Sequence, residues 1–104
     1  MFPSQVRVGP YTFIVKVAEN GAAEDSYGWT DWKREHILIE DGLPLTTTRD
    51  TLLHEVLHVA HWASGLRDRF GEDEEELVTR QLSPWLLMVL QQNPQLVEFL
   101  TGRG

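Results

Sequence analysis

The stretch TLLHEVLHVA at residues 51–60 decides how the second half of this 104-residue chain is expected to fold. Its apolar residues recur at spacings of three and four, which is the periodicity of a helix that buries one face. The sequence TTRD at residues 47–50 matches the capping-box pattern, in which Asp50 can reach back to the first free amides of the helix. The pair Ser64-Gly65 supplies a glycine, which often follows the end of a helix. We therefore predict a helix that begins at about residue 51 and ends before this pair.

The same stretch contains the pattern H-E-x-x-H, formed by His54, Glu55 and His58. On a helix with 3.6 residues per turn, His54 and His58 lie one above the other on a single face. Two imidazoles at that separation can converge on one tetrahedral zinc ion, with ligand bonds of about 2.0 to 2.1 Å. Glu55 is offset by roughly 100° and can hold a zinc-bound water without being a ligand. The pattern therefore predicts a hydrolytic zinc site in which Glu55 is the general base.

A hydrolytic zinc site needs a third protein ligand and an open fourth position. His61 continues the histidine stripe, but along a straight helix it lies about 10 Å from His54, which is too far to share one metal. The acidic cluster at residues 72–76 is the other source, because a helical hairpin would bring the start of a second helix back towards the first. Carboxylates are also favoured at helix N-termini by the helix dipole alone. The alternative is therefore a chain without metal, in which the histidines are ordinary polar side chains.

Within the acidic cluster, Glu75 is the expected third ligand. It precedes Val78 and Leu82 by three and seven residues, so it shares the face that we expect to point inwards. Glu74 shares that face through Val78 and stays possible. Glu76 completes a second capping-box spacing and is expected to be occupied at the start of the helix.

The second helix carries an apolar stripe of Val78, Leu82 and Trp85. Pro84 lies inside this stretch and is expected to kink or split the helix, because proline lacks the N–H that the helix needs. A short final helix is predicted at Pro94–Leu100. We expect these last apolar segments to close the core; alternatively, they form an interface or fold over the metal.

The first forty residues are rich in branched and aromatic types and predict β-strands. Gly9-Pro10 marks a turn, and residues 19–28 suit a loop. His36 alternates with apolar neighbours, so it is expected on an exposed face, or else as a donor to a reaction intermediate. Strands are predicted at Val6–Val8, Tyr11–Val17, Trp29–Trp32 and His36–Glu40.

The aromatic side chains have two interpretations. Tyr27, Trp29 and Trp32 can line a cleft, although aromatic residues in a small domain usually belong to the core. Trp62 and Trp85 are expected to pack between the helices.

Composition narrows the class of protein. The chain has 9 Lys and Arg against 16 Asp and Glu, for a net charge of −7, which argues against nucleic acid as a partner. It has no cysteine, so disulfides and thiolate ligands are excluded. No apolar run is long enough to cross a bilayer, and the first residues show no secretory signal pattern. We expect residues 1–104 to form one domain that is located in the cytoplasm.

With these motifs the chain resembles the gluzincin branch of the zincin metallopeptidases. The likeness is carried by TLLHEVLH at residues 51–58, EELV at residues 75–78 and a helix that ends in QNP at residues 92–94. More narrowly, the chain is similar to small zincin-like proteins of tailed bacteriophages and prophages, and to minimal gluzincins of about this length. The likeness covers the chain from residue 36 onwards. By position, it implies zinc held by His54, His58 and Glu75, with Glu55 as general base.

The resemblance also implies an α+β, zincin-like fold. A small, mainly antiparallel sheet of three or four strands would be followed by an active-site helix, a glutamate helix and a short C-terminal helix. The strand His36–Glu40 would lie near the cleft, as an edge for an extended peptide. Metzincins are excluded, because they would have Gly and His where this chain has His61 and Ser64. Larger gluzincins have a second lobe below the cleft, for which this chain is expected to have no residues.

The expected function is zinc-dependent hydrolysis of a peptide or protein substrate, in a latent or partner-dependent form. We expect a monomer or weak homodimer that binds neither nucleic acid nor membrane. The alternative is a non-enzymatic, zinc-stabilised module of phage or prophage type that binds another protein. Its metal would be unreachable by water, and its chain would show no cleavage that depends on Glu55.

Overall fold

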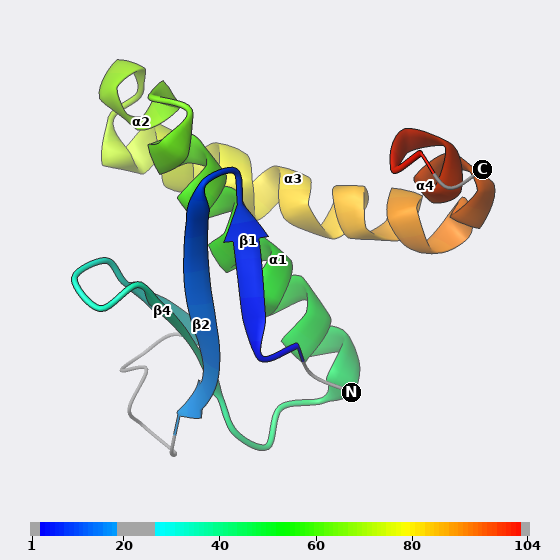
Figure 1. Cartoon of the computed structure of the whole chain (residues 1–104), viewed down its shortest axis with the longest axis horizontal. Coiled ribbons are helices and arrows are strands. Elements are labelled where there is room, and N and C mark those ends of the chain that lie inside the picture. Colours follow the sequence, from blue (N-terminus) through cyan, green and yellow to red (C-terminus); the bar gives the residue numbers. More distant parts are fainter. Residues whose placement is uncertain (1–2, 19–26, 103–104) are drawn as a thin grey trace.

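The computed structural model describes residues 3–18 and 27–102, which form a four-stranded sheet followed by helices (Figure 1). The strands are β1 (Gln5–Val8), β2 (Tyr11–Ala18), β3 (Gly28–Asp31) and β4 (His36–Glu40). The helices are α1 (Leu45–Ala63), α2 (Leu66–Arg69), α3 (Glu72–Gln92) and α4 (Pro94–Leu100). The predicted α+β class is confirmed, and so are the four strands to within a residue or two. The short helix α2 has no counterpart in the sequence prediction, and most of the predicted loop at residues 19–28 lies outside the described residues.

The strands lie in the order β1-β2-β4-β3. β1 pairs with β2 and β3 with β4 in antiparallel fashion, whereas β2 and β4 are parallel, so the sheet is mainly antiparallel as expected. The expectation that His36–Glu40 forms an edge is wrong. β3 folds back on β4 through a short turn and covers that side, so β3 is the edge strand there and β1 is the edge strand on the other side.

One face of the sheet packs against α1 and holds the hydrophobic core. Because strand side chains alternate between the two faces, Phe13 and Val15 of β2 point the same way, as do Ile37 and Ile39 of β4. Val59 of α1 completes this buried cluster. In Figure 1, α1 lies behind β1 and β2 across this face. The core therefore fixes the orientation of α1, and with it the side chains that α1 turns towards β3 and α3.

An aromatic cluster extends the core at one end of α1. The ring centroid of Trp62 lies 4.7 Å from that of Tyr11, 6.4 Å from that of Phe13 and 5.6 Å from that of Trp32. Trp62 thus packs on the aromatic residues of the sheet side, and the expectation that it packs between helices is wrong.

The helix α1 begins at Leu45 rather than at about residue 51. The backbone N–H and the hydroxyl of Thr48 both donate to the carbonyl oxygen of Pro44, so the first turn forms directly after the proline. No side chain caps this end, and the predicted capping role of Asp50 is wrong, because Asp50 already lies within the second turn. The predicted end is confirmed, since Gly65 has a φ of 80°, in the left-handed region that glycine adopts without strain.

The helix α3 runs unbroken through Pro84, so the expected split does not occur. Its buried residues are Glu75, Thr79 and Ser83, one on each successive turn. The predicted inward stripe is wrong: Leu82 and Trp85 are 53% and 67% exposed. The physical reason is that α3 meets α1 through polar side chains, which leaves the apolar stripe uncovered.

The final helix α4 occupies its predicted residues but does not close the core. None of its residues is buried, and Figure 1 shows it at the far end of α3, away from the sheet. It therefore does not fold over the histidines of α1. Within residues 3–18 and 27–102, no helix is long and apolar enough to cross a membrane.

Candidate metal centre

The two histidines of α1 converge as their spacing predicts. Nε2 of His54 lies 3.1 Å from Nε2 of His58. One ligand atom from each of His54, Glu55 and His58 lies within 4.8 Å of the others, so this group could hold a metal ion. The sequence prediction that these three side chains gather at one place is borne out.

Two consecutive glutamates of α3 meet the histidines from the other side. Oε1 of Glu76 lies 3.1 Å from Nε2 of His54, and Oε2 of Glu76 lies 3.0 Å from Nε2 of His58. Oε1 of Glu75 lies 3.0 Å from Nδ1 of His58, the ring nitrogen on the opposite side. Glu76 therefore contacts the Nε2 atoms of both histidines, whereas Glu75 contacts the opposite side of the His58 ring. The expected capping role of Glu76 is wrong, because no side chain caps α3.

Arginines accompany both glutamates. Nε of Arg67 lies 3.3 Å from Oε2 of Glu75, which is almost fully buried. The guanidinium of Arg67 also lies 4.8 Å from the ring centroid of Trp32, in a cation–π arrangement that fixes its position. A buried carboxylate is costly without such partners, so Arg67 and His58 together explain why Glu75 can be buried. On the more open side, Arg80 lies 3.4 Å from Oε1 of Glu76.

Glu55 is held by the edge strand. The hydroxyl of Thr30 in β3 donates to Oε1 of Glu55 at 2.7 Å, and both residues are buried. β3 can approach α1 this closely because residue 28 is a glycine. A Cβ on Gly28 would lie 2.6 Å from Cγ2 of Thr51 and 3.3 Å from Cγ of Glu55, which leaves no room for a side chain.

These side chains line a cleft of about 690 Å³ between β3, α1 and the start of α3. Trp29, Trp32 and Lys33 contribute to its wall, and Tyr27 lines a smaller adjoining pocket that shares His54 and Glu55. The cleft interpretation of the three aromatic residues is therefore confirmed, although Trp32 also packs against the core. The cleft also contains charges of both signs from Asp31, Arg67, Glu72 and Asp73.

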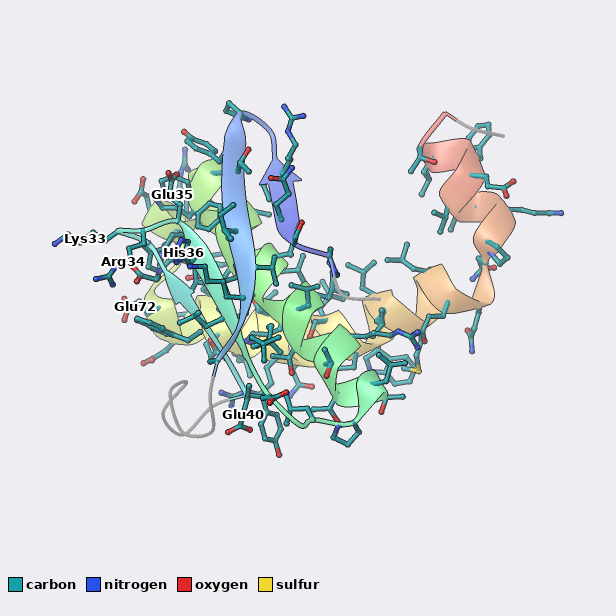
Figure 2. The ribbon with its side chains drawn as sticks, turned by 60° about the horizontal axis from the view of Figure 1, so that its bottom comes forward. Lys33, Arg34, Glu35, His36, Glu40 and Glu72 are labelled. Carbon is teal, nitrogen blue, oxygen red and sulfur yellow. The ribbon has the colours of Figure 1, made fainter. Side chains whose placement is uncertain are left out.

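The turn between β3 and β4 borders the cleft. Figure 2 shows Lys33, Arg34 and Glu35 projecting from it. Oδ1 of Asp31 accepts hydrogen bonds from the backbone N–H groups of Lys33 and Arg34, each at 3.1 Å, and Oδ2 lies 3.0 Å from NH1 of Arg34. The backbone N–H of Arg34, followed by its side chain, holds the pKa of Asp31 below its ordinary value. Asp31 therefore stays ionised and keeps this turn closed at neutral pH.

The remaining histidines lie outside the cleft. His36 begins β4 and alternates with the buried Ile37, which places it on the sheet face opposite α1, as expected for an exposed-face residue. Nε2 of His61 lies 3.4 Å from the hydroxyl of Thr79, and its buried Nδ1 has no hydrogen-bond partner among the described residues. His61 thus belongs to the contact between α1 and α3.

Sequence reasoning did not identify Thr30, Gly28 or Arg67 as parts of the site. Thr30 lies within a predicted strand, but the order of the strands cannot be read from one sequence. Arg67 lies on α2, and this helix of four residues is too short to show a periodic pattern in the sequence.

Comparisons of the chain with protein-family models, curated proteins and solved structures found no match.

Proposed function

We propose that the chain is a zinc-dependent metallopeptidase whose metal ligands are His54, His58 and Glu76. Tetrahedral zinc with ligand bonds of about 2.0 to 2.1 Å requires its ligand atoms to lie about 3.3 Å from one another. Here the two Nε2 atoms lie 3.1 Å apart, and the Glu76 carboxylate meets each of them with a different oxygen, Oε1 at 3.1 Å from His54 and Oε2 at 3.0 Å from His58. This convergence is the observation that carries the proposal.

Glu76 takes the place that the sequence assigned to Glu75. The oxygen of Glu75 contacts Nδ1 of His58, which a metal on Nε2 leaves available for a second partner. Histidine ligands commonly donate this other N–H to a carboxylate, which fixes the tautomer and the ring orientation. We therefore assign Glu75 to positioning His58, with Arg67 holding Glu75 in turn.

Zinc, when bound at such a site, polarises a carbonyl and lowers the pKa of a coordinated water. Glu55 takes the proton of the attacking water, because its carboxylate lies beside the histidines and is not needed as a ligand. Thr30 donates its hydroxyl to Oε1 of Glu55, and this hydrogen bond holds the orientation of the carboxylate at the cleft. The water oxygen bonds to the carbonyl carbon, the C–N bond breaks, and Glu55 passes the proton to the leaving amine.

The open cleft supports hydrolysis over a purely structural metal. The side chains of His54, His58 and Glu76 are 20%, 15% and 40% exposed, so water and a substrate can reach the point where they converge. A substrate peptide in extended form can lie beside the edge strand β3, in the cleft that Trp29 and Trp32 line. The non-enzymatic module would instead need a closed metal site.

The test combines metal analysis with one substitution. Purified wild type should contain about one zinc per chain and cleave a mixed-sequence peptide library, with products read by mass spectrometry. Glu55→Gln should keep the zinc and slow cleavage by about 10²- to 10⁴-fold, because only the proton acceptor is lost. Glu40→Gln on β4, the same change outside the cleft and its adjoining pocket, should cleave like wild type.

Two outcomes contradict the proposal in different ways. A wild type that takes up no zinc removes the metal centre altogether. Bound zinc with cleavage that is absent, or unaffected by Glu55→Gln, removes the peptidase and leaves the zinc-stabilised binding module.

A further inference from the structure

Most of α3 and all of α4 form an arm, residues 77–100, whose part beyond Ser83 projects from the rest of the molecule. Figures 1 and 2 both show the end of α3 and α4, in orange and red, extending beyond the sheet and α1. Beyond Ser83, none of its residues is buried. Arg80, near the start of the arm, contacts Glu76, but no residue of the arm beyond Arg80 lines the cleft or its adjoining pocket.

The arm displays an apolar seam, which consists of Val78, Leu82, Trp85 and Val89 on α3. All four side chains are at least 39% exposed. Their spacing of four, three and four residues is that of the a and d positions of a coiled coil. A seam of this kind forms when a second helix packs along the first, and no helix of the described chain covers it.

The helix α4 also has exposed apolar side chains. Leu96, Phe99 and Leu100 are exposed, and Phe99 has the largest exposed fraction of these, at 74%. An isolated helix shorter than about 12 residues is marginal in water, so the seven residues of α4 depend on packing against other helices, and a second copy could supply more of it than α3 alone.

We infer that the arm is an interface at which a second copy of this chain docks, seam against seam. The charge distribution favours a self-complementary contact. The chain carries a net charge of −7, yet residues 81–97 contain no charged side chain. Two copies can therefore meet along the arm without the like-charge repulsion that their other surfaces would impose.

The exposed apolar area of the arm is of the order that a contact between two copies needs. Aromatic side chains offer roughly 150 to 250 Å² each, and Trp85 and Phe99 are 67% and 74% exposed. Together with the exposed aliphatic residues of the arm they present on the order of several hundred Å², against about 800 Å² that a standard interface buries on each partner.

A membrane surface fits the arm less well than a second copy does. Helices that lie on membranes carry Lys and Arg on their polar face and are attracted to anionic lipids. The polar residues of the arm between Arg80 and Glu98 are Gln, Asn and Ser, and the chain as a whole is acidic.

The first experiment is sedimentation velocity on the full chain across a dilution series. Wild type should be a dimer that dissociates on dilution. Trp85→Glu should raise the dissociation constant about thirtyfold or more, because it places a like charge from each copy at the centre of the seam. Leu45→Glu is the matched control: Leu45 is an equally exposed apolar residue on α1, outside the arm, and its replacement should leave the dimer unchanged.

The second experiment detects the contact between two copies directly, by cross-linking, and does not require a substitution that disrupts it. The chain contains no cysteine, so a single Leu82→Cys variant should form disulfide-linked dimers on oxidation, and Leu45→Cys should not. A wild type that stays monomeric at every concentration overturns the inference. So does a dimer that Leu45→Glu, but not Trp85→Glu, disrupts, and so does a monomer that sediments with anionic phospholipid vesicles through the arm.

Discussion

In the proposed centre, two neighbouring glutamates have two different roles. Consecutive residues on a helix point about 100° apart, so Glu75 and Glu76 cannot meet the same histidine nitrogen. Glu76 reaches the space between the Nε2 atoms of His54 and His58, and Glu75 lies on the far side of the His58 ring. Burial alone would have favoured Glu75, since it is the more buried of the two. The proposed roles of the two glutamates therefore depend on which histidine nitrogen each carboxylate contacts, and not on how deeply each side chain is buried.

Substitution of each glutamate should reveal this division. We expect Glu76→Ala to abolish stoichiometric zinc binding, because a third of the protein ligands is lost. Glu75→Gln should keep one zinc per chain but weaken its affinity about 10- to 100-fold, because His58 loses its orienting carboxylate. Competition with a coloured chelator measures both, and Glu74→Gln, an exposed neighbour, serves as control. Stoichiometric zinc in Glu76→Ala together with its loss in Glu75→Gln would return the ligand role to Glu75.

The sequence predicted the residues of the centre that are close in the chain. His54, Glu55 and His58 lie within one turn or so, and helical geometry alone brings them together. The contacts of Glu55 with Thr30, and of Glu75 with Arg67, join segments whose relative placement depends on the sheet order and on α2. A single sequence carries no periodic signal for either.

At the scale of elements, α3 is the helix whose orientation the sequence failed to predict. The usual rule turns the apolar stripe towards the core, and it works for α1, where Val59 is fully buried. In α3 the buried row is Glu75, Thr79 and Ser83 instead. The rule fails because α3 packs against the histidine-bearing face of α1 and makes no part of the sheet's core.

Pro84 should lower the stability of α3, because it lies inside the helix. It supplies no N–H to the preceding turn, although the helix continues on both sides. We expect Pro84→Ala to raise the free energy of unfolding by about 1 to 3 kcal/mol in urea denaturation, with the seam unchanged. Pro94→Ala is the internal comparison, because Pro94 occupies the first turn of α4, where an N–H is unpaired in any case. Equal effects of the two substitutions would show that the helix interior is not what Pro84 weakens.

The whole molecule divides into two unequally stabilised parts. The apolar core lies between the sheet and α1. The contact of α1 with α3 depends on polar pairs: His58 with Glu75, His61 with Thr79, and Asp50 with Ser83. A metal held by residues of both helices would add the strongest link between the two parts.

Removal of the metal should therefore destabilise α3 and α4 and leave the core between the sheet and α1 unchanged. After chelation of zinc, we expect the amides of α3 and α4 to exchange with deuterated water much faster. The reason is that the strongest link between α3 and α1 has then been removed. The amides of β2 and β4 should keep their protection, since the core around Phe13 and Ile37 is untouched. Hydrogen exchange read by mass spectrometry distinguishes this from uniform loss of protection, which would mean that the metal stabilises the whole fold equally.

The helix α3 carries Glu76 at the metal centre and, two residues later, Val78 at the start of the seam. Any ligand that orders α3 for one of these tasks has already met the entropic cost of ordering it for the other. Metal binding and self-association are then thermodynamically linked, and the linkage is reciprocal. The affinity of the chain for its metal would rise with the concentration of the chain itself, so that abundance would act as an effector of the site.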